Sequence, residues 1–563
     1  MKELDECVNI VLAGEAGQGI QSIETLLSRI LKQEGYHLFS TKEYMSRIRG
    51  GVNSTLIRVA AHRVAAYSQR SDLVILLNQE GAEHLKDRIS TDTLVLGEGT
   101  RISYPGLIDV PFSRIASEIG NGLFANTVAV GVICGMFQAD LGRIERILQQ
   151  HYASKAAAIH EGNMEAVRRG YSLAKEVLTD KLRLSIKRDE ANRDDLLYSG
   201  SEAIALGALA GGCDFTCAYP MSPSTGVLTA MASYGKSFDV IVEQVEDEVG
   251  VVNMALGAWY AGARALVTTS GGGFALMMEG FSLAGMIESP LVVHLAQRPG
   301  PATGLPTRTE QADLNLALYA GHGEFPRVIL APGTLEQGFR LTQQAFHIAS
   351  RYQLPVVILT DQYFVDSYYN SPQPDLQGLQ PDRHIVRTSP GYRRYDLKSG
   401  PVSPRGLPGY GDGFVKVDSD EHDEDGHITE DLELRARMVR KRMGKLELLR
   451  REAAMPELSG APGAETMVIS WGSTFHAVEE ALARIPRGAV SHLHFSQVYP
   501  LPSGLEKLLA QAQKRIVIEG NAGGQFARLL ERETGVPIDR EVLKYNGMPF
   551  AVEEIAAVLG EIR

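Results

Sequence analysis

Three segments in the middle of the chain combine residue types that could bind a ligand and carry out chemistry on it. The first, AYPMSPST at 218–225, offers three hydroxyls on a loop that two prolines hold extended. The second, 242–264, opens with acidic residues and continues with small and apolar ones. Tight packing keeps a carboxyl at the start of such a helix dry, which raises its pKa. The third, 295–307, places Arg298 directly after a predicted buried strand.

A glycine-rich segment lies between the second and third of these. Residues 268–277, TTSGGGFALM, predict a strand that ends in three glycines. Open α/β sheets bind ligands at the carboxyl ends of their parallel strands. Because most of these polar segments follow predicted strands, we expect them to share one edge of a sheet.

Two glycine turns elsewhere have the pattern of phosphate-binding sites. Residues 12–19, LAGEAGQG, and residues 518–527, IEGNAGGQFA, each lie between a predicted strand and a predicted helix. Glycine there lets the helix N-terminus face an anion. The first turn reads G-x-x-G-x-G, unlike the G-x-G-x-x-G of dinucleotide-binding sites, and no ribose-binding acid follows it. Each turn is either part of a phosphate site or an ordinary strand-to-helix connection.

Short apolar runs alternate with amphipathic segments over the first third of the chain. This alternation indicates a parallel sheet with helices on both faces. We expect a helix over 20–35 that ends at Gly35, since glycine adopts the left-handed conformation of many helix ends. The predicted strands are 8–14, 37–41, 72–77, 93–99 and 101–111.

The same α/β pattern returns twice in the rest of the chain, with an irregular stretch between the two occurrences. That stretch holds an intensely acidic run, 418–431, whose spacing does not fit a calcium-binding EF-hand loop. We expect a solvated loop that pairs with the basic helix 434–451. The predicted parts are an α/β domain at 1–180, a charged linker at 181–197, an α/β domain at 198–365, an irregular segment at 366–464 and an α/β domain at 465–563.

Composition excludes several classes of protein. The net charge of −12 disfavours nucleic acid and anionic membranes as partners. No apolar run is long enough to span a bilayer, and the N-terminal segment lacks the cationic region of a signal peptide. The four cysteines form no disulfide framework. We therefore expect a cytoplasmic protein.

The motifs together resemble the 2-oxoacid:ferredoxin oxidoreductases. YPMSPST resembles the Y-P-I-T-P-S loop of that family, and EDEVG, TSGGGF and QRPGPATGLPTRTEQADL (297–314) resemble the alpha subunit of its 2-oxoglutarate-type branch. GEAGQG and SRIRGG (46–51) are similar to the gamma component, here fused ahead of alpha. The resemblance covers essentially the whole chain. It implies a gamma-type domain, a thiamine-diphosphate pyrimidine-binding domain and a C-terminal domain like that of transketolase.

The resemblance assigns the activating glutamate to Glu248. A carboxyl bonded to N1′ of the aminopyrimidine promotes the imino tautomer that removes the proton from thiazolium C2. The alternative role for Glu248 is to complement the helix dipole. Glu243, Glu246 and Asp247 suit that role better.

The resemblance also assigns binding residues. Ser222 stands where the family usually has threonine, which keeps the hydroxyl but loses the methyl that restricts its rotamer. Arg298 resembles the arginine that binds the substrate carboxylate, the alternative being an ion pair that supports the loop. Thr303 and Thr307 are further candidates to line the substrate pocket. The implied cofactor contacts are Tyr219, Pro220, Met221, Glu248, Ser270, Gly271 and Gly272, and the candidates for coenzyme A are Gly14, Gly17, Gly19, Gly523 and Gly524.

Two motifs of such enzymes are absent from the sequence. The GDG at 411–413 has no Asn-Asn partner downstream, so the segment that binds Mg²⁺ and diphosphate is missing. Cys213 and Cys217 form a C-x₃-C without a second pair, which is too few thiolates for a [4Fe–4S] cluster and indicates buried free thiols. The family's beta subunit carries both groups, so we expect an (αβ)₂ assembly that passes electrons to ferredoxin.

The implied reaction is the reversible oxidative decarboxylation of a 2-oxoacid with coenzyme A. Its products are an acyl-CoA, CO₂ and reduced ferredoxin. The segment QRPGPATGLPT favours 2-oxoglutarate as the substrate. Pyruvate, arylpyruvates and branched-chain 2-oxoacids stay open, as does a non-catalytic assembly subunit, although Glu248 and Arg298 argue against the last.

Overall fold

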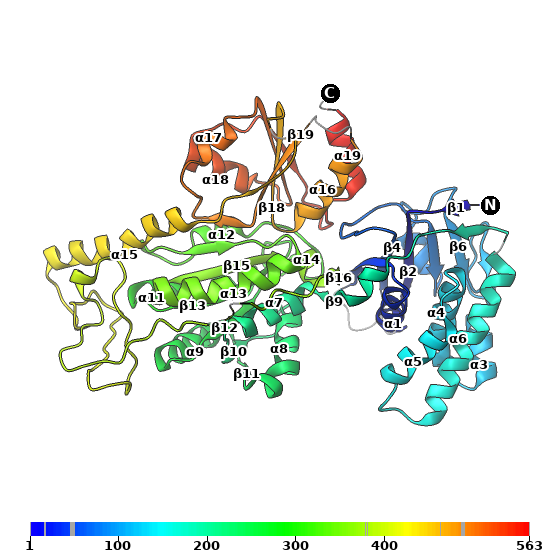
Figure 1. The fold of residues 1–563 in the computed structure, drawn as a ribbon, viewed down its shortest axis with the longest axis horizontal. Coiled ribbons are helices and arrows are strands. Elements are labelled where there is room, and N and C mark those ends of the chain that lie inside the picture. Colours follow the sequence, from blue (N-terminus) through cyan, green and yellow to red (C-terminus); the bar gives the residue numbers. More distant parts are fainter. Residues whose placement is uncertain are drawn as a thin grey trace. The chain divides into compact units, whose positions relative to one another are not determined.

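The computed structural model describes residues 2–15, 18–45, 51–178, 180–377, 379, 381–461, 463–485 and 490–561. It forms two compact units (Figure 1). Unit 1 comprises Met1–Ser199, Asp366–Gln373 and Ala551–Glu554, and unit 2 comprises Gly200–Val365, Pro374–Phe550 and Ile555–Arg563. In the described part of the chain, no helix has the length and apolar character needed to cross a membrane.

Unit 1 is built on an eight-stranded sheet of order β7-β6-β5-β2-β4-β3-β16-β9. The central strand β2 (Cys7–Glu15) runs parallel to β5 (Leu73–Leu76) but antiparallel to β4 (Val52–Ala60). The expectation of a purely parallel sheet is therefore wrong for this unit, because β4 was missed in the sequence. The other strands are β3 (His37–Glu43), β6 (Leu94–Gly97), β7 (Ile108–Asp109), β9 (Leu196–Ser199) and β16 (Tyr368–Ser371).

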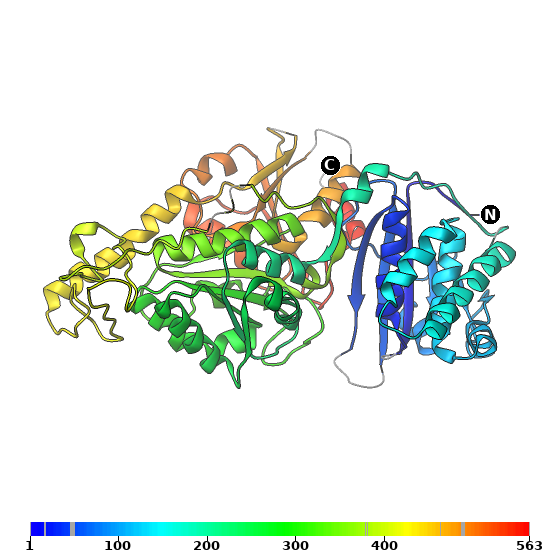
Figure 2. The same ribbon diagram turned by 60° about the horizontal axis from the view of Figure 1, so that its bottom comes forward.

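The first two helices of unit 1 pack against these strands, and the others pack chiefly on helices (Figure 2). Helix α1 (Ile20–Gln33) ends where predicted, with Gly35 at a left-handed φ of 89°. The strand predicted at 101–111 is reduced to β7, because a turn at Gly106 breaks it and Leu107 N donates to Tyr104 O. The other helices are α2 (Glu80–His84), α3 (Phe112–Ile119), η1 (Gly122–Phe124), α4 (Ala125–Met136), α5 (Leu141–His151) and α6 (Ala157–Leu178).

The charged stretch 181–197 is more ordered than a solvated linker. Its strand β8 (Leu182–Leu184) pairs with β1 (Lys2–Leu4), and η2 (Glu190–Asp194) follows. Arg188 donates to the carbonyl of Phe137 at 3.3 Å. Charged side chains in this stretch thus bond to main-chain carbonyls of the unit, a pairing that composition does not reveal.

Unit 2 contains a seven-stranded sheet of order β11-β10-β12-β13-β15-β14-β20. All neighbours are parallel except β20 (Gln497–Tyr499), which runs antiparallel to β14. The other strands are β10 (Phe215–Ala218), β11 (Ile241–Gln244), β12 (Ala265–Thr269), β13 (Leu291–Gln297), β14 (Val328–Leu330) and β15 (Pro355–Asp361). The strands predicted before the glycines at 271–273 and before Arg298 are confirmed as β12 and β13.

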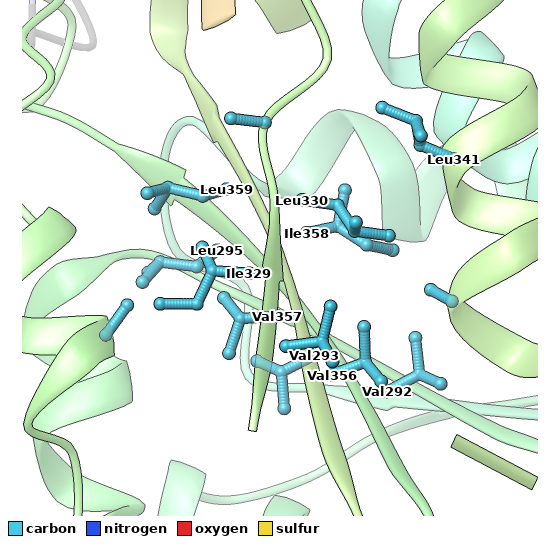
Figure 3. Packing of buried hydrophobic residues seen from close by; sticks show 14 of the residues in the cluster. Val292, Val293, Leu295, Ile329, Leu330, Leu341, Val356, Val357, Ile358 and Leu359 are labelled. Carbon is cyan, nitrogen blue, oxygen red and sulfur yellow. The ribbon is translucent and has the colours of Figure 1, made fainter. Parts of the chain in front are cut away.

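The core of this sheet is apolar on both faces. Every residue of β13 and β15 is buried. Along β15 the side chains of Val356 and Ile358 lie on one side of the strand, and those of Val357 and Leu359 on the other (Figure 3). Burial on both faces explains the continuous apolar runs that predicted these strands. The helices are α7 (Gly200–Ala210), α8 (Thr225–Phe238), α9 (Glu248–Ala261), α10 (Gly271–Leu276), α11 (Met278–Met286), α12 (Leu314–Leu318), α13 (Leu335–Tyr352) and α14 (Gln362–Asp366).

A five-stranded sheet of order β17-β19-β18-β21-β22 follows toward the C-terminus. It is parallel apart from β17 (Glu457–Gly460). The strands are β18 (Thr466–Trp471), β19 (Val490–Phe495), β21 (Lys514–Glu519) and β22 (Arg540–Leu543), and the helices are η4 (Gly472–Thr474), α16 (Phe475–Ala483), α17 (Leu505–Leu509), α18 (Gln525–Thr534) and α19 (Val552–Gly560).

The segment expected to be irregular, 366–464, contains the strands β16 and β17. Its described residues from 374 to 431 are irregular apart from η3 (Leu397–Ser399), and the basic helix α15 (Leu432–Glu452) follows. The expected pairing of the acidic run with this basic helix is confirmed, because Glu421 bridges Arg435 and Arg442. A second ion cluster is fully buried. Glu288 accepts from Lys441 at 2.8 Å and bridges Lys445 at 2.5 Å.

Candidate active site

The candidate residues lie along the carboxyl edge of the seven-stranded sheet. Tyr219 follows β10, Ser270 follows β12 and Arg298 follows β13. Parallel register between β12, β13 and β15 brings these strand ends to the same edge. The three loops are therefore neighbours in the fold (Figure 1).

Glu248 is the first residue of α9 and is 2% exposed. Asp247 caps this helix by accepting from Gly250 N at 2.7 Å, so the capping role falls to its exposed neighbour. No hydrogen-bond partner for Glu248 Oε1 is found in the described part of the chain. Burial raises the pKa of Glu248 and the charge of Asp247 adds to this, while hydrogen bonds from its own backbone N–H and from Thr269 oppose the shift. The site thus holds a buried carboxyl whose neutral form is more favourable than in a free glutamate.

The space for this carboxyl comes from Gly273. A Cβ at Gly273 would lie 2.1 Å from Glu248 Oε1 and 2.3 Å from Thr269 Oγ1. Sequence reasoning selected Ser270, Gly271 and Gly272 from the same motif and missed Gly273.

The three residues selected from that motif differ in their surroundings. Ser270 Oγ is buried, and the described residues offer it no hydrogen-bond partner. A Cβ at Gly271 would lie 2.4 Å from Asp313 Oδ2, whereas nothing lies within 4 Å of a Cβ at Gly272. Gly271 therefore leaves room for Asp313, whereas Gly272 borders open space.

The structure brings Ser222 and Arg298 together. Arg298 Nη1 donates to the backbone carbonyl of Ser222 at 2.6 Å, although 76 residues separate them. Ser222 is exposed and Arg298 is half-buried. Burial lowers the pKa of Arg298, and the charge of Asp313 opposes this shift. The contact involves the main chain of Ser222, which leaves its hydroxyl free to face a ligand.

The loop that carries Ser222 is positioned by hydrogen bonds from two hydroxyls. Ser224 Oγ donates to Met221 O at 2.7 Å, and Thr268 donates to Ser224 O at 3.4 Å. Tyr219 is exposed, and Pro220 and Met221 are half-buried. The three predicted cofactor contacts of this loop are thus accessible.

Thr303 and Thr307 lie on the loop after Arg298. Thr303 is exposed and Thr307 is half-buried. Leu305 N donates to Pro299 O at 3.0 Å and closes the loop. Among the described hydrogen bonds, none joins either threonine to Glu248 or Arg298.

Asp313 is a half-buried acid that was not predicted from the sequence. It lies directly before α12. Burial raises its pKa to about 6, against the opposing charge of Arg298. The only signal in the sequence was its place inside QRPGPATGLPTRTEQADL.

The first glycine turn is described in part, since Gly17 and most of SRIRGG (46–50) lie outside the described residues. Glu15 N donates to Gln18 Oε1 at 2.7 Å. Gly19 has a φ of 77° at the start of α1, and a Cβ there would lie 2.1 Å from Asn126 Nδ2. A Cβ at Gly14 would lie 2.5 Å from Gln18 Oε1, so at both described glycines an added Cβ would displace the end of a polar side chain.

The second glycine turn already holds a carboxylate. Glu519 accepts from Phe526 N at 3.0 Å and from Ala527 N at 3.1 Å, two N–H groups of the first turn of α18. Gly523 and Gly524 shape this turn, and a Cβ at Gly524 would lie 2.1 Å from Glu541 Oε2. The donors expected to face a phosphate are thus bonded to a residue of the chain itself.

A cavity of about 840 Å³ lies beside the first turns of α9. Its lining includes the apolar residues Val249, Leu276 and Phe325 and the basic residues Arg435 and Arg442. Neither Glu248 nor Arg298 lines it, so it is separate from the candidate catalytic groups.

Cys213 and Cys217 are buried free thiols, as expected. Burial raises their pKa to about 11 and about 12. The GDG turn packs on Thr388, whose carbonyl accepts from Asp412 N at 2.9 Å. Within the ranges that the structure describes, no group of three His, Cys, Asp or Glu residues is placed to hold a metal ion.

Comparison with known proteins identifies the family. The family model described as "Pyruvate flavodoxin/ferredoxin oxidoreductase, thiamine diP-bdg" matches residues 206–441, and "Pyruvate ferredoxin/flavodoxin oxidoreductase" matches residues 9–173. The alpha subunit of 2-oxoacid:ferredoxin oxidoreductase 1 from Aeropyrum pernix is 31% identical, over 81% of this chain and 73% of that protein. The 2-oxoglutarate oxidoreductase subunit KorA from Mycobacterium tuberculosis is 28% identical, over 98% of this chain and 90% of its own length.

A solved structure extends the comparison to the fold. The 2-oxoglutarate:ferredoxin oxidoreductase from Magnetococcus marinus, with 2-oxoglutarate, coenzyme A and succinyl-CoA bound, superposes with a TM-score of 0.92. It is 29% identical, and the match covers 99% of this chain and 100% of that one. The chain therefore belongs to the 2-oxoacid:ferredoxin oxidoreductases, as an alpha subunit of that multi-subunit enzyme family.

Proposed function

We propose that this chain, with a beta subunit, converts 2-oxoglutarate, coenzyme A and oxidised ferredoxin reversibly into succinyl-CoA, CO₂ and reduced ferredoxin. The observation that carries the proposal is Glu248, a buried carboxyl with an oxygen that has no partner among the described residues, at the edge where open α/β sheets bind ligands. Its surroundings match the task of an acid that holds a proton against a ring nitrogen.

The residues present fit thiamine diphosphate. Glu248 Oε1 and Ser270 Oγ are both buried polar atoms without a partner in the described chain, and a bound aminopyrimidine ring would supply one. When bound, the cofactor supplies the carbon nucleophile that adds to the keto group of a 2-oxoacid. Glu248 would hold a proton between Oε1 and N1′ of that ring, which its raised pKa favours.

Arg298 would bind the carboxylate of the 2-oxoacid. A guanidinium has five N–H donors in a planar fork, and one hydrogen bond from Arg298, to Ser222 O, is recorded among the described residues. The other donors are left for a carboxylate. The Ser222 hydroxyl would then lie beside the keto or carboxylate oxygen, with Thr303 and Thr307 on the outer part of the pocket.

The chain needs a second polypeptide for complete activity. Its sequence lacks the motif for Mg²⁺ and diphosphate and the four cysteines of a [4Fe–4S] cluster. We assign both groups to a beta subunit in an (αβ)₂ assembly that reduces ferredoxin. For coenzyme A we retain Gly14 and Gly19, since the other glycine turn is occupied by Glu519.

The choice of 2-oxoglutarate is supported by the ligands in the Magnetococcus marinus structure and by the names of the KorA relatives. An anaerobic assay of the two-chain complex across 2-oxoglutarate, pyruvate, arylpyruvates and branched-chain 2-oxoacids, with and without coenzyme A, tests this choice. The highest kcat/KM for 2-oxoglutarate is expected. A higher value for another 2-oxoacid would reassign the substrate.

The assembly-subunit alternative is tested by the same preparation. Co-expression with the partner under anaerobic conditions should give a brown complex with coenzyme-A-dependent turnover. A colourless chain that remains alone would contradict the proposed function.

A further inference from the structure

Asp313 is tied to the loop that carries Arg298. Its backbone N–H donates to Gln297 Oε1 at 2.9 Å, and Gln297 Nε2 donates to Thr360 O at 3.0 Å. Gln297 is fully buried at the end of β13 and directly precedes Arg298. One amide side chain therefore fixes Asp313 beside the candidate substrate-binding arginine.

No group in the described part of the chain donates a hydrogen bond to the carboxyl of Asp313. It packs on Gly271, where a Cβ would lie 2.4 Å from Oδ2 and 2.8 Å from Oδ1. Arg298 acts on it with an opposite charge, and no ion pair within 4 Å joins the two described side chains. Glu310 is the other charged neighbour. Burial raises the pKa of Glu310 and the charge of Asp313 adds to this.

We propose that Asp313 is the resident counter-charge of Arg298 and that it takes up a proton when the carboxylate of a 2-oxoacid binds there. The inference rests on the proposed function, in which Arg298 binds that carboxylate. With substrate present, one guanidinium faces two carboxylates in a half-buried place, and protonation of Asp313 removes the excess negative charge.

The same acid then serves the later part of the cycle. The carboxylate bound to Arg298 leaves as CO₂, so the guanidinium loses its counter-charge during turnover. Asp313 restores that charge by releasing its proton. This makes Asp313 a positioning residue that acts through Arg298, on the opposite side of the glycine motif from Glu248.

The sign of the pH dependence follows from this coupling. Below a pH of about 6 Asp313 is protonated before substrate arrives, and binding needs no proton. Above that pH binding requires a proton, so KM for the 2-oxoacid should rise by up to tenfold per pH unit. Asp313→Asn carries no charge at any pH. It should therefore bind substrate more tightly than the wild type at pH 8, although it lacks an acid of the site.

The test uses the two-chain complex with thiamine diphosphate, measured from pH 5.5 to 8.5. We expect a rising KM for the wild type and a nearly constant KM for Asp313→Asn. Glu310→Gln is the matched control, because it removes the neighbouring negative charge and should keep the rise. Calorimetry of 2-oxoglutarate binding in two buffers of different ionisation enthalpy should show proton uptake by the wild type and none by Asp313→Asn.

Other outcomes overturn the inference. An Asp313→Asn complex whose KM follows the wild-type pH profile, or whose KM is higher at every pH, would exclude the counter-charge role. If Asp313→Asn does not fold, Gly271→Ala displaces the carboxyl instead and should shift the midpoint of the pH profile. An unchanged midpoint would again exclude the role.

Failure of the proposed function gives a different result. If Arg298→Lys leaves KM unchanged for every 2-oxoacid, Arg298 does not bind substrate, and the part of the proposed function on which Asp313 depends is refuted. If Arg298→Lys raises KM while Asp313→Asn keeps the wild-type pH profile, only the role of Asp313 is refuted. C2 proton exchange of the bound cofactor should stay at the wild-type rate in Asp313→Asn, because Glu248 is untouched.

Discussion

Replacing Gly273 with alanine tests whether the space beside this glycine is needed to position the Glu248 carboxyl. Gly273 lies inside α10 without a positive φ, so its backbone does not require glycine. The added methyl would lie 2.1 Å from Glu248 Oε1, whereas Cβ atoms keep about 3.0 Å from such neighbours. The Glu248 carboxyl and Thr269 Oγ1, which would lie 2.3 Å from the same methyl, are both ends of side chains, so both must shift, the carboxyl by roughly 1 Å.

The size of the effect follows from that displacement. A misplacement of about 1 Å costs about 100-fold in rate, which is about 2.7 kcal/mol in activation free energy. The cost in stability is smaller. Overpacking costs about 1–3 kcal/mol, and alanine regains about 1 kcal/mol of helix propensity, so the variant should fold and assemble.

The assay is the exchange of the C2 proton of bound thiamine diphosphate for deuterium, followed by NMR after acid quench. It is run on the complex with the beta subunit, at saturating cofactor, together with anaerobic turnover. Gly257→Ala is the matched control, because Gly257 lies in α9 on the Glu248 helix and nothing lies within 4 Å of its Cβ. We expect both rates to fall about 100-fold in Gly273→Ala and to change less than about twofold in the control.

One result would refute the reasoning. If Gly273→Ala exchanges the C2 proton at the wild-type rate while turnover is lost, then Gly273 does not act through the Glu248 carboxyl. A slow exchange in Gly257→Ala would mean that any change in these helices perturbs the cofactor, which refutes the specific contact equally.

Three further substitutions test other parts of the site and the fold. Glu248→Gln keeps the shape but removes the proton, so turnover and C2 exchange should fall by at least about 100-fold while size-exclusion chromatography still shows the complex. Arg298→Lys loses the planar fork, and initial rates should show a KM for the 2-oxoacid about tenfold higher. Glu288→Gln leaves Lys441 and Lys445 buried without their carboxylate. Urea denaturation should show a free energy of unfolding lower by about 3–5 kcal/mol.

The two acids among these residues, Glu288 and Glu248, also make the stability of the protein depend on pH. Burial opposes ionisation of Glu288, but the charges of Lys445 and Lys441 hold its pKa below the usual range. Its contribution is therefore present at neutral pH and is lost only as the pH falls well below the ordinary range of a glutamate. Burial raises the pKa of Glu248, so that carboxyl costs stability as the pH rises, and Glu248→Gln should not be less stable than the wild type at pH 7. A marked loss of stability in Glu248→Gln, or none in Glu288→Gln, would contradict these assignments.

Much of unit 2 could be predicted from the sequence because its strands are buried on both faces. Such strands appear as continuous apolar runs, and the polar segments that follow them must meet at one edge. The contact between Arg298 and Ser222 is a consequence of that rule. Unit 1 was harder to predict, since β4 carries polar residues among its apolar ones and makes the sheet mixed.

The rest of the site depends on contacts between distant segments. The sequence alone gives Gly273 no particular role. Its role becomes visible only when the fold places it beside Glu248, which lies on another helix. Asp313 and Glu288 are ordinary acids in the sequence. Only the fold shows that the charge of Arg298 acts on Asp313 and that Glu288 contacts two buried lysines. Glu519 likewise occupies a helix N-terminus that its glycine turn alone would assign to a phosphate.

The short helix α10 lies between the two acids of the proposed site. Glycine inside a helix costs about 1 kcal/mol relative to alanine, and Gly271 and Gly273 each lie where a Cβ would strike a carboxyl oxygen. Two positions apart on a helix, their Cβ directions point to nearly opposite sides. The helix therefore separates Glu248 from Asp313 by the thickness of its backbone. Two acids of raised pKa can then titrate with little mutual repulsion, one for the proton at N1′ and one for the charge on Arg298.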